Sequence, residues 1–235
     1  QSAEKACEAV SAVFRAGITP SALEFIERDA IDWTLKFTDI EIDISNDVKA
    51  HLLVEVDGND MELLYKDCEK IAEVMEGFEC GEILLADSES QKEQLWKLRR
   101  AIGEAVKVNS VYKEEDTTVP RAELPKLLKG VKAIGEVYGF KSICYGHAGD
   151  GNLHINIIKG EMSDNDWNNK LPLGIREIFE LTKSLGGTLS GEHGIGLVQK
   201  DYMDIVFSKK ALNLQKGIKQ LFDPNQILNP GKLFK

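Results

Sequence analysis

The chain has 235 residues, of which 43% are hydrophobic and 29% charged, a composition typical of a globular protein with a substantial core. Its 29 basic and 39 acidic residues give a net charge of -10, which argues against nucleic acid as a partner and requires a local positive site for an anionic ligand. No apolar run reaches the roughly 18 residues of a membrane span, and the first residues lack the pattern of a signal peptide. The four cysteines form no Cys-x-x-Cys pair, so neither a disulfide framework nor an iron–sulfur cluster is predicted, and we expect a reduced cytoplasmic protein.

Helical and extended patterns alternate along the chain. The predicted elements, in chain order, are a helix over 3–16 that ends at Gly17, a strand over 52–56, a helix over 61–75, a strand over 83–86, a helix over 88–108 that begins with a Ser-x-x-Gln capping box, an extended segment over 112–119, a helix reaching Tyr138, two strands within 141–158, and helices over 173–185 and 208–222. The polar segment 159–170 is predicted to be a surface loop. This order predicts the α+β class, with helices packed on an antiparallel sheet.

Three of the four histidines stand among glycines, within 145–156 and 190–196. Apolar runs on both sides of the first glycine group predict two strands joined by a turn. Such a turn folds the second strand back, so that His147 and His154 can face one point. With the carboxylate of Glu192 they form a three-ligand set for a divalent metal, with positions left open for water or substrate.

Other interpretations fit parts of this pattern. A lone histidine in a strand is more often a structural residue, and this is our prediction for His51. The glycines could instead cradle a phosphate, but the order Gly146, Gly149 and Gly151 is not that of a dinucleotide-binding loop, and no helix pattern follows it. Three ligand types in such settings are a rarer coincidence than one, which favours the metal site.

The same segments resemble a known family. Gly-His-x-Gly-Asp-Gly-Asn-Leu-His at 146–154, Ser-Gly-Glu-His-Gly-Ile-Gly at 190–196 and the ending at 222–232 resemble the C-terminal domain of FAD-linked 2-hydroxy-acid oxidases and dehydrogenases. This family includes the glycolate oxidase FAD-binding subunit, D-lactate dehydrogenase and D-2-hydroxyglutarate dehydrogenase. Further matching segments, which extend the resemblance over nearly the whole chain in the expected order, are 16–24, 95–99 and 116–121.

The resemblance implies a ferredoxin-like antiparallel sheet within 50–158 and flanking helices. It also implies that residues 1–235 are the C-terminal, substrate- and metal-binding domain of an FAD-dependent enzyme, and that the N-terminal FAD-binding domain is absent from this chain. Such an enzyme oxidises a 2-hydroxy acid of the glycolate or D-lactate type to the 2-keto acid, with hydride transfer to FAD. The electron acceptor is left open, and we expect this fragment to be inactive alone.

The residue types suit that chemistry. A divalent metal, Zn²⁺ or Mn²⁺, in the His–His–Glu set would chelate the carboxylate and hydroxyl oxygens of the substrate and lower the pKa of the hydroxyl. His193 is predicted to take the proton as catalytic base, since an imidazole titrates near neutral pH. Neighbours on an extended chain face opposite ways, so Gly191 and Gly194 must turn the backbone. In the alternative, Glu192 is an outer partner and His193 is itself a ligand.

Two substrate-binding residues follow from the resemblance. Arg99 matches the position that binds the substrate carboxylate, whereas the sequence alone predicts an exposed helical arginine paired with Glu93 or Glu104. Asn156 matches a residue near the substrate, although an amide that closes a sheet edge explains it equally well.

Three further lysine or asparagine positions concern the cofactor and the substrate. Asn229 and Lys232, in the Asn-Pro-Gly-Lys ending, match the family's return towards the flavin domain, and the alternative is a plain C-terminal turn. Some members carry a lysine that touches a distal substrate carboxylate. Here the nearest is Lys113, which is out of register, and this departure argues against a dicarboxylate substrate.

A second class of function remains open from the residues. The ligand set alone would also permit a free-standing divalent-metal hydrolase or a small-molecule binding module. The Asn-Pro-Gly-Lys ending and the helix that carries Arg99 favour the oxidoreductase.

Overall fold

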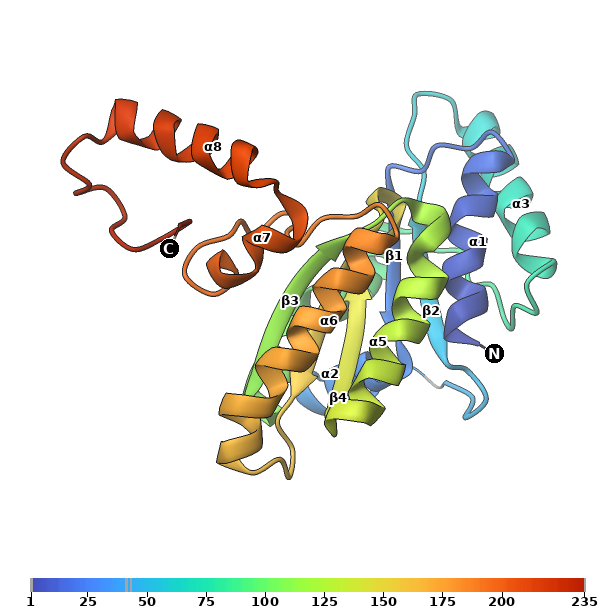
Figure 1. Ribbon diagram of the computed structural model, residues 1–235. Coiled ribbons are helices and arrows are strands. Elements are labelled where there is room, and N and C mark those ends of the chain that lie inside the picture. The colour runs from blue at the N-terminus through green and yellow to red at the C-terminus, as the bar shows by residue number, and fades with distance from the viewer. Residues whose placement is uncertain (1, 41, 43, 235) are drawn as a thin grey trace.

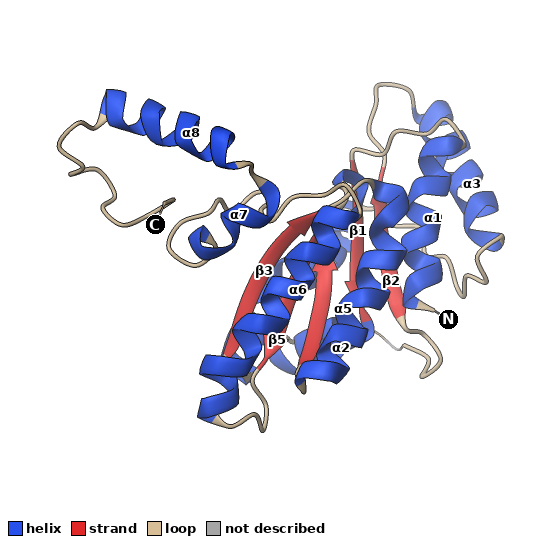
Figure 2. Ribbon diagram, viewed as in Figure 1, coloured by secondary structure: helices blue, strands red, loops and turns tan. Residues whose placement is uncertain are grey.

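Five antiparallel strands form the sheet at the centre of the molecule (Figures 1 and 2). The computed structural model describes residues 2–40, 42 and 44–234. From one edge to the other, the strands are β2 (Ala50–Glu55), β1 (Ala22–Glu27), β4 (Lys141–Gly146), β5 (Asn152–Ile158) and β3 (Tyr112–Thr118). Every neighbouring pair is antiparallel, which confirms the predicted α+β class.

Helices cover both faces of this sheet (Figure 1). One face carries α1 (Ala3–Arg15), α5 (Leu124–Tyr138) and α6 (Leu171–Ser184), and the other carries α2 (Arg28–Phe37) and α4 (Glu89–Asn109). The remaining helices are α3 (Met61–Glu76), which packs beside α1, the short α7 (Met203–Val206) and α8 (Lys209–Phe222). Among the described residues, no helix has both the length and the apolar character needed to cross a membrane.

Successive side chains on a strand point to opposite faces of the sheet, so the strands contribute to two apolar cores, one on each face. In β4, Cys144 belongs to the core beneath α5 and α6, whereas Ile143 and Tyr145 pack with Ile102 of α4 in the second core. Beyond Tyr145 on this second face, polar side chains replace apolar ones. The candidate site lies there.

The predicted histidine hairpin is confirmed. β4 and β5 are joined by a 3₁₀ turn, η2 (Ala148–Asp150), and their register pairs Tyr145 with His154 and Ile143 with Asn156. β5 lies between β4 and β3, while α5 connects β3 to β4. These elements form a split β-α-β unit, the building block of ferredoxin-like sheets.

The helix signals in the sequence also hold. Ser88 and Gln91 form the predicted capping box at the start of α4. α1 ends just before Gly17, whose φ of 84° is left-handed. α8 begins after Ser208, whose side chain caps it, as expected for a helix over 208–222.

The predicted and the observed strands differ in two places. The predicted strand over 83–86 is wrong, because this segment is irregular and Ile83, Leu84 and Leu85 are exposed. Conversely, β1 was not predicted, although it lies between β2 and β4. Its apolar run is interrupted by Glu24 and Glu27, which obscures the pattern of a buried strand.

The segment 159–170 is only partly the predicted loop. Its second half forms a π-helical turn, η3 (Asp166–Lys170), that buries Trp167 and leads into α6. Two further 3₁₀ turns are η1 (Arg121–Glu123) and η4 (Lys200–Tyr202). All four cysteines are free thiols.

Candidate active site

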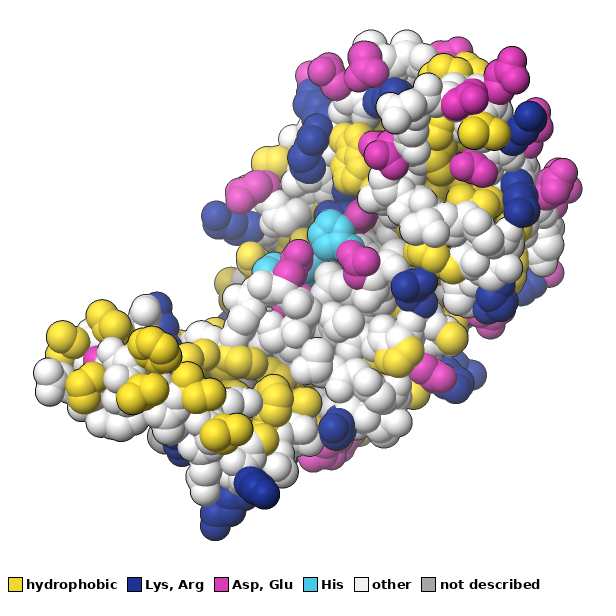
Figure 3. Space-filling view, turned by 90° about the horizontal axis from the view of Figure 1, so that it is seen from above, with side chains coloured by type: hydrophobic (Ala, Val, Ile, Leu, Met, Phe, Trp, Pro, Cys, Tyr) yellow, Lys and Arg dark blue, Asp and Glu magenta, His cyan; other side chains and the backbone are white. Residues whose placement is uncertain are grey.

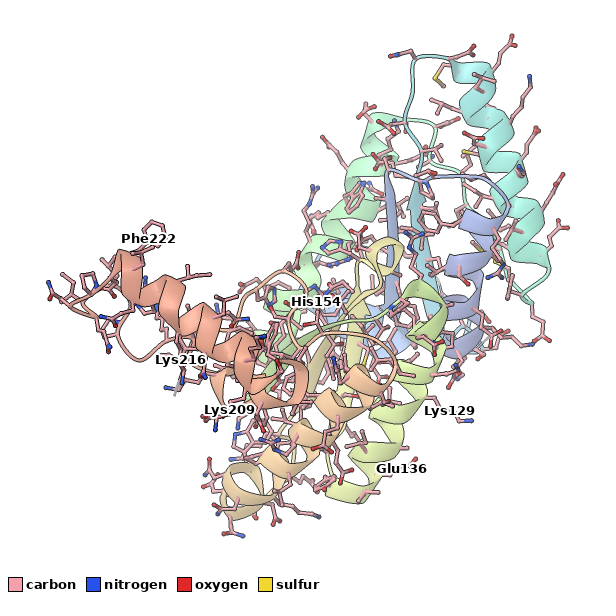
Figure 4. All side chains as sticks on the ribbon, turned by 45° about the horizontal axis from the view of Figure 1, so that its top comes forward. Lys129, Glu136, His154, Lys209, Lys216 and Phe222 are labelled. Atoms are coloured by element: carbon pink, nitrogen blue, oxygen red, sulfur yellow. The ribbon has the colours of Figure 1, made fainter. Side chains whose placement is uncertain are left out.

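The residues predicted to hold and use a metal come from two segments that are distant in sequence. His147 follows the end of β4 and His154 lies on β5, whereas Glu192 and His193 lie in the loop between α6 and α7, here called the site loop (residues 185–199). The rings of His147 and His154 are 6.0 Å apart, centroid to centroid. Figure 4 labels His154 near the centre of the molecule, and Figure 3 shows histidine at the surface, flanked by acidic side chains.

Three residues of this cluster meet as a ligand set. His154 Nε2 lies 3.2 Å from Glu192 Oε1, and His147 Nε2 lies 3.7 Å from Glu192 Oε2. The ligand atoms of the three residues all lie within 4.8 Å of one another. A tetrahedral metal with bonds of about 2.0–2.2 Å places neighbouring ligand atoms about 3.3–3.6 Å apart. The observed spacing therefore fits a divalent cation.

The cluster is closed at its base and open on one side. The side chain of His154 is 5% exposed, whereas those of His147 and Glu192 are 40% and 48% exposed. A catalytic metal needs three protein ligands and an open position for water or substrate. The exposure of this cluster meets that requirement.

The buried partner of the cluster is Glu24, a residue that the sequence patterns did not indicate. Glu24 lies on β1, and its Oε1 is 2.7 Å from His147 Nδ1. Glu24 can accept a hydrogen bond from Nδ1–H of His147, and in the tautomer that carries its proton on Nδ1 the lone pair of Nε2 faces Glu192. A glutamate within the apolar run of β1 was the available signal, since buried charges are kept where they are paired.

His154 also has an acidic neighbour. Glu114 Oε1 on β3 lies 3.2 Å from His154 Nδ1, although the two groups are not aligned as a hydrogen bond. A second set of possible ligand atoms, from Glu114, His154 and His193, also lies within 4.8 Å. The alternative in which His193 is a ligand therefore has a geometric basis.

One buried carboxylate anchors the site loop. Asp116 Oδ2 on β3 accepts hydrogen bonds from the backbone amides of Glu192 and His193, each at 2.8 Å. Asn152 donates to Asp116 Oδ1 at 2.6 Å. Burial alone would raise the pKa of the Asp116 carboxyl, but these hydrogen bonds outweigh it and lower the pKa. Asp116 is therefore an anion that presents two consecutive side chains to the cluster.

Glycine permits this close approach. A Cβ on Gly191 would lie 2.2 Å from Asn152 Nδ2 and 2.4 Å from Thr118 Oγ1, so a larger residue would push the site loop away from β3. Gly194 has a left-handed φ of 79°. Gly194 thus provides the predicted turn of the backbone, whereas Gly191 permits the close approach to β3.

His193 lies beside the ligand set. Its Nε2 is 3.7 Å from Glu192 Oε1, and its ring stacks on that of His154 with centroids 5.1 Å apart. Its side chain is half-exposed. A solvent-accessible imidazole in this position can receive a proton from a group bound at the open side of the cluster.

Arg99 is not the exposed helical arginine that its sequence neighbours predict. It is buried, and among the described residues its ion-pair partner is Glu24, with Nε 2.8 Å from Oε2, rather than Glu93 or Glu104. Its guanidinium lies 5.0 Å from the ring centre of Tyr145. Burial raises the pKa of Tyr145 to about 12, so this ring stays neutral. Arg99 joins the cluster through Glu24.

Asn156 and Lys113 are placed less directly. Asn156 shares a strand face with His154 but is fully buried, and its Oδ1 has no hydrogen-bond partner in the described part of the chain. Lys113 lies on the opposite face of the sheet, with Nζ 5.4 Å from the ring centre of Trp167. Strand alternation therefore turns Lys113 away from the cluster and gives the site face to Glu114.

The C-terminal tail after α8 returns to the site loop. Leu233 N donates to Gly196 O at 2.9 Å. Asn229 and Lys232 are exposed in this tail and bond to each other, Lys232 Nζ to Asn229 Oδ1 at 3.1 Å. A cavity of about 560 Å³ opens between the tail, α8 and the site loop, and its lining includes Ser190, Glu192, Ile195, Met203, Phe207, Ile218 and Phe234.

Known proteins match nearly the whole chain. Residues 1–233 match the family described as "FAD linked oxidases, C-terminal domain". D-lactate dehydrogenase of Anaerostipes hadrus is 32% identical over 221 residues, which are 92% of this chain and 46% of the relative. Glycolate oxidase subunit GlcD of Bacillus subtilis (strain 168) is 33% identical over 233 residues, 98% of this chain and 48% of the relative. The chain thus spans about half the length of these relatives.

Solved structures agree on the fold. 4-Ethylphenol oxidase from Gulosibacter chungangensis superposes with a TM-score of 0.59 at 13% identity, over 91% of this chain and 47% of that one. p-Cresol methylhydroxylase superposes with a TM-score of 0.58 at 13% identity, over 97% of this chain and 50% of that one. Since the family model matches residues 1–233, the chain belongs to the FAD linked oxidases, whose C-terminal domain it represents.

Proposed function

We propose that this chain is the substrate- and metal-binding lobe of an FAD-dependent dehydrogenase or oxidase that converts a 2-hydroxy acid of the glycolate or D-lactate type to the 2-keto acid. The observation that carries the proposal is the convergence of His147 Nε2, His154 Nε2 and Glu192 beside an exposed imidazole and a buried guanidinium. Relatives at 32–33% identity are named D-lactate dehydrogenase, glycolate oxidase subunit GlcD and D-2-hydroxyglutarate dehydrogenase. Family membership favours this function over a metal hydrolase.

The metal is inferred from the donor set. With its Nδ1 proton directed at Glu24, His147 turns the lone pair of Nε2 towards the carboxylate oxygens of Glu192. In that tautomer two acceptors converge and fit a bound cation, and imidazole with carboxylate suits Zn²⁺ or Mn²⁺. The flavin is assigned to an N-terminal FAD-binding domain, because the glycines around His147 lie in a β-hairpin rather than at a helix N-terminus.

The bound groups would supply a two-electron oxidant, from the flavin, and positive charge that lowers the pKa of the substrate hydroxyl, from the cation. Arg99 would bind the substrate carboxylate and fix its orientation. His193 would take the hydroxyl proton on Nε2 while the α-hydrogen leaves the carbon with its electron pair, and the C–O bond becomes C=O. Asn156, which is buried on the same strand face as His154, would support the buried side of the site.

An apolar surface on the C-terminal segment gives the N-terminal domain a place to dock. α8 stands apart from the sheet (Figure 1), and Figure 3 shows apolar side chains spread over this part of the molecule. Its exposed apolar residues include Leu214, Ile218, Leu221, Phe222, Ile227 and Leu228. Exposed apolar patches of this kind mark interaction sites. Asn229 and Lys232, next to this patch, would then lie near the cofactor.

The test is a visible spectrum of the full-length protein that contains this chain. We expect flavin absorption that is bleached by glycolate or D-lactate under anaerobic conditions and restored by an electron acceptor. A colourless protein, or a flavin that no 2-hydroxy acid reduces, would contradict the proposal.

A further inference from the structure

We propose that Glu24 is a positioning residue that holds both the metal ligand His147 and the substrate-binding guanidinium of Arg99, an inference that rests on the proposed function. One carboxylate contacts both groups: Oε1 is 2.7 Å from His147 Nδ1 and Oε2 is 2.8 Å from Arg99 Nε. Glu24 is 3% exposed, so neither contact is diluted by solvent. No other described residue contacts both His147 and Arg99 through ion pairs or hydrogen bonds.

The strand pairing explains how Glu24 reaches both partners. The register pairs Phe25 with Gly146 and Ile26 with Tyr145, so Glu24 lies opposite His147 at the end of β4. Arg99 comes from α4, on the same face of the sheet, where its guanidinium also rests on the ring of Tyr145. The buried carboxylate therefore joins a residue of the hairpin to a residue of the covering helix.

The chemistry of the two contacts differs. Towards His147, Glu24 accepts a hydrogen bond from Nδ1–H and so favours the tautomer in which Nε2 is free to bind a cation. Towards Arg99, it occupies only Nε, and the two Nη groups have no hydrogen-bond partner among the described residues. That remaining edge offers two parallel N–H donors, the geometry that recognises a substrate carboxylate. Glu24 thus fixes the spacing between the metal and the carboxylate-binding group.

Glu27 provides a matched control on the same strand. Its carboxylate is also largely buried and paired, with Lys132 Nζ at 2.7 Å and the backbone amide of Cys144 at 2.8 Å. It belongs to the opposite face of the sheet and touches neither His147 nor Arg99. Glu27→Gln therefore removes a buried charge from β1 without changing the proposed contacts.

The experiment compares Glu24→Gln with Glu27→Gln in the full-length flavoprotein. Apoprotein freed of metal by chelation is titrated with Co²⁺ and followed by its visible d–d absorption. We expect Glu24→Gln to weaken Co²⁺ affinity about 10–100-fold, and to raise the KM for glycolate or D-lactate about tenfold, the worth of one hydrogen bond to a charged group. Glu27→Gln should keep both values near those of the wild type.

Equal Co²⁺ affinity and equal KM in wild type and Glu24→Gln would overturn the inference. Wild-type protein that binds no Co²⁺ would instead refute the proposed metal site, so the two failures are distinguishable. If Glu24→Gln does not fold, the wild type still decides. Its Co²⁺ complex should show a paramagnetically shifted, slowly exchanging ring N–H proton, because a coordinated His147 hydrogen-bonds to a buried carboxylate, and absence of any such signal would overturn the inference.

Discussion

The ligand atoms of His147, His154 and Glu192 lie close enough to share one cation, and this closeness makes each of them individually testable. Removal of either imidazole leaves two ligands, too few for tight binding of a first-row divalent metal. We expect His147→Ala and His154→Ala to lose bound Zn²⁺ or Mn²⁺, as measured by elemental analysis of the purified protein. His51→Ala, on β2, is the control and should retain the metal. Unchanged metal content in both site variants would show that this cluster does not bind the metal.

His193 and Glu192 are neighbours with different predicted roles. His193→Ala should lower kcat about 10²–10⁴-fold, the usual worth of a general base, while metal content stays unchanged. Glu192→Gln should lower both metal affinity and rate, because a neutral amide replaces an anionic ligand. Metal loss in His193→Ala combined with metal retention in Glu192→Gln would exchange the two roles.

Glu115 makes stability depend on pH from the opposite face of the sheet. Its burial raises the pKa to about 8, an effect that Gln199 and Lys113 offset only in part. The unfolded carboxyl titrates near 4.3, so between about pH 4.3 and 8 the folded protein keeps a proton that the unfolded chain has lost. Stability therefore falls as pH rises through this window and levels off above it.

Glu115→Gln should abolish this pH dependence. The variant and the wild type should be similarly stable near pH 4.5, and the variant should be more stable above pH 8, by about a few kcal/mol. Urea unfolding at both pH values measures the difference. A constant gap between the two proteins would show that Glu115 titrates normally.

At the scale of elements, the site depends on how the site loop lies against β3. Gly191→Ala adds a methyl group that meets Asn152 and Thr118, and we expect it to displace Glu192 and lower metal affinity at least tenfold while the sheet stays folded. Gly217→Ala on α8 is the control, since nothing lies within 4 Å of its added Cβ. Circular dichroism and Co²⁺ titration of both variants separate loop displacement from unfolding. Wild-type affinity in Gly191→Ala would show that the contact is relieved without moving the ligand.

Some elements of the fold could be predicted from the sequence, and others could not. The hairpin and most of the longer helices were predictable because glycines, caps and apolar periods act within a few residues, whereas α2 was not predicted. β1 was not, because its glutamates at 24 and 27 are buried only through partners on distant elements, Arg99 and Lys132. The segment 83–86 is the opposite case, a predicted strand that does not form. Its residues favour the extended conformation, but it pairs with no neighbouring strand. Glu24 was missed for the same reason as the strand that carries it.

At the scale of the whole molecule, the chain presents the proposed metal site and an apolar surface on α8. We expect the isolated 235-residue chain to show no turnover of glycolate or D-lactate with dye acceptors, because the hydride acceptor belongs to the other half. Addition of the separately produced N-terminal half should restore activity and reduce binding of an apolar dye to the patch around Leu221 and Phe222. Turnover by the isolated chain would contradict the assignment of the hydride acceptor to the N-terminal half.

The anchoring of the site loop by Asp116 predicts how the proposed metal site would respond to a change of metal. A single oxygen, Oδ2, receives the amides of both Glu192 and His193. The proposed ligand and the proposed base are therefore held by one anchor, and a change of metal radius that shifts one should also shift the other. Selection for a different metal should for this reason yield second mutations near Asp116 that return the imidazole of His193 to its proposed position as base.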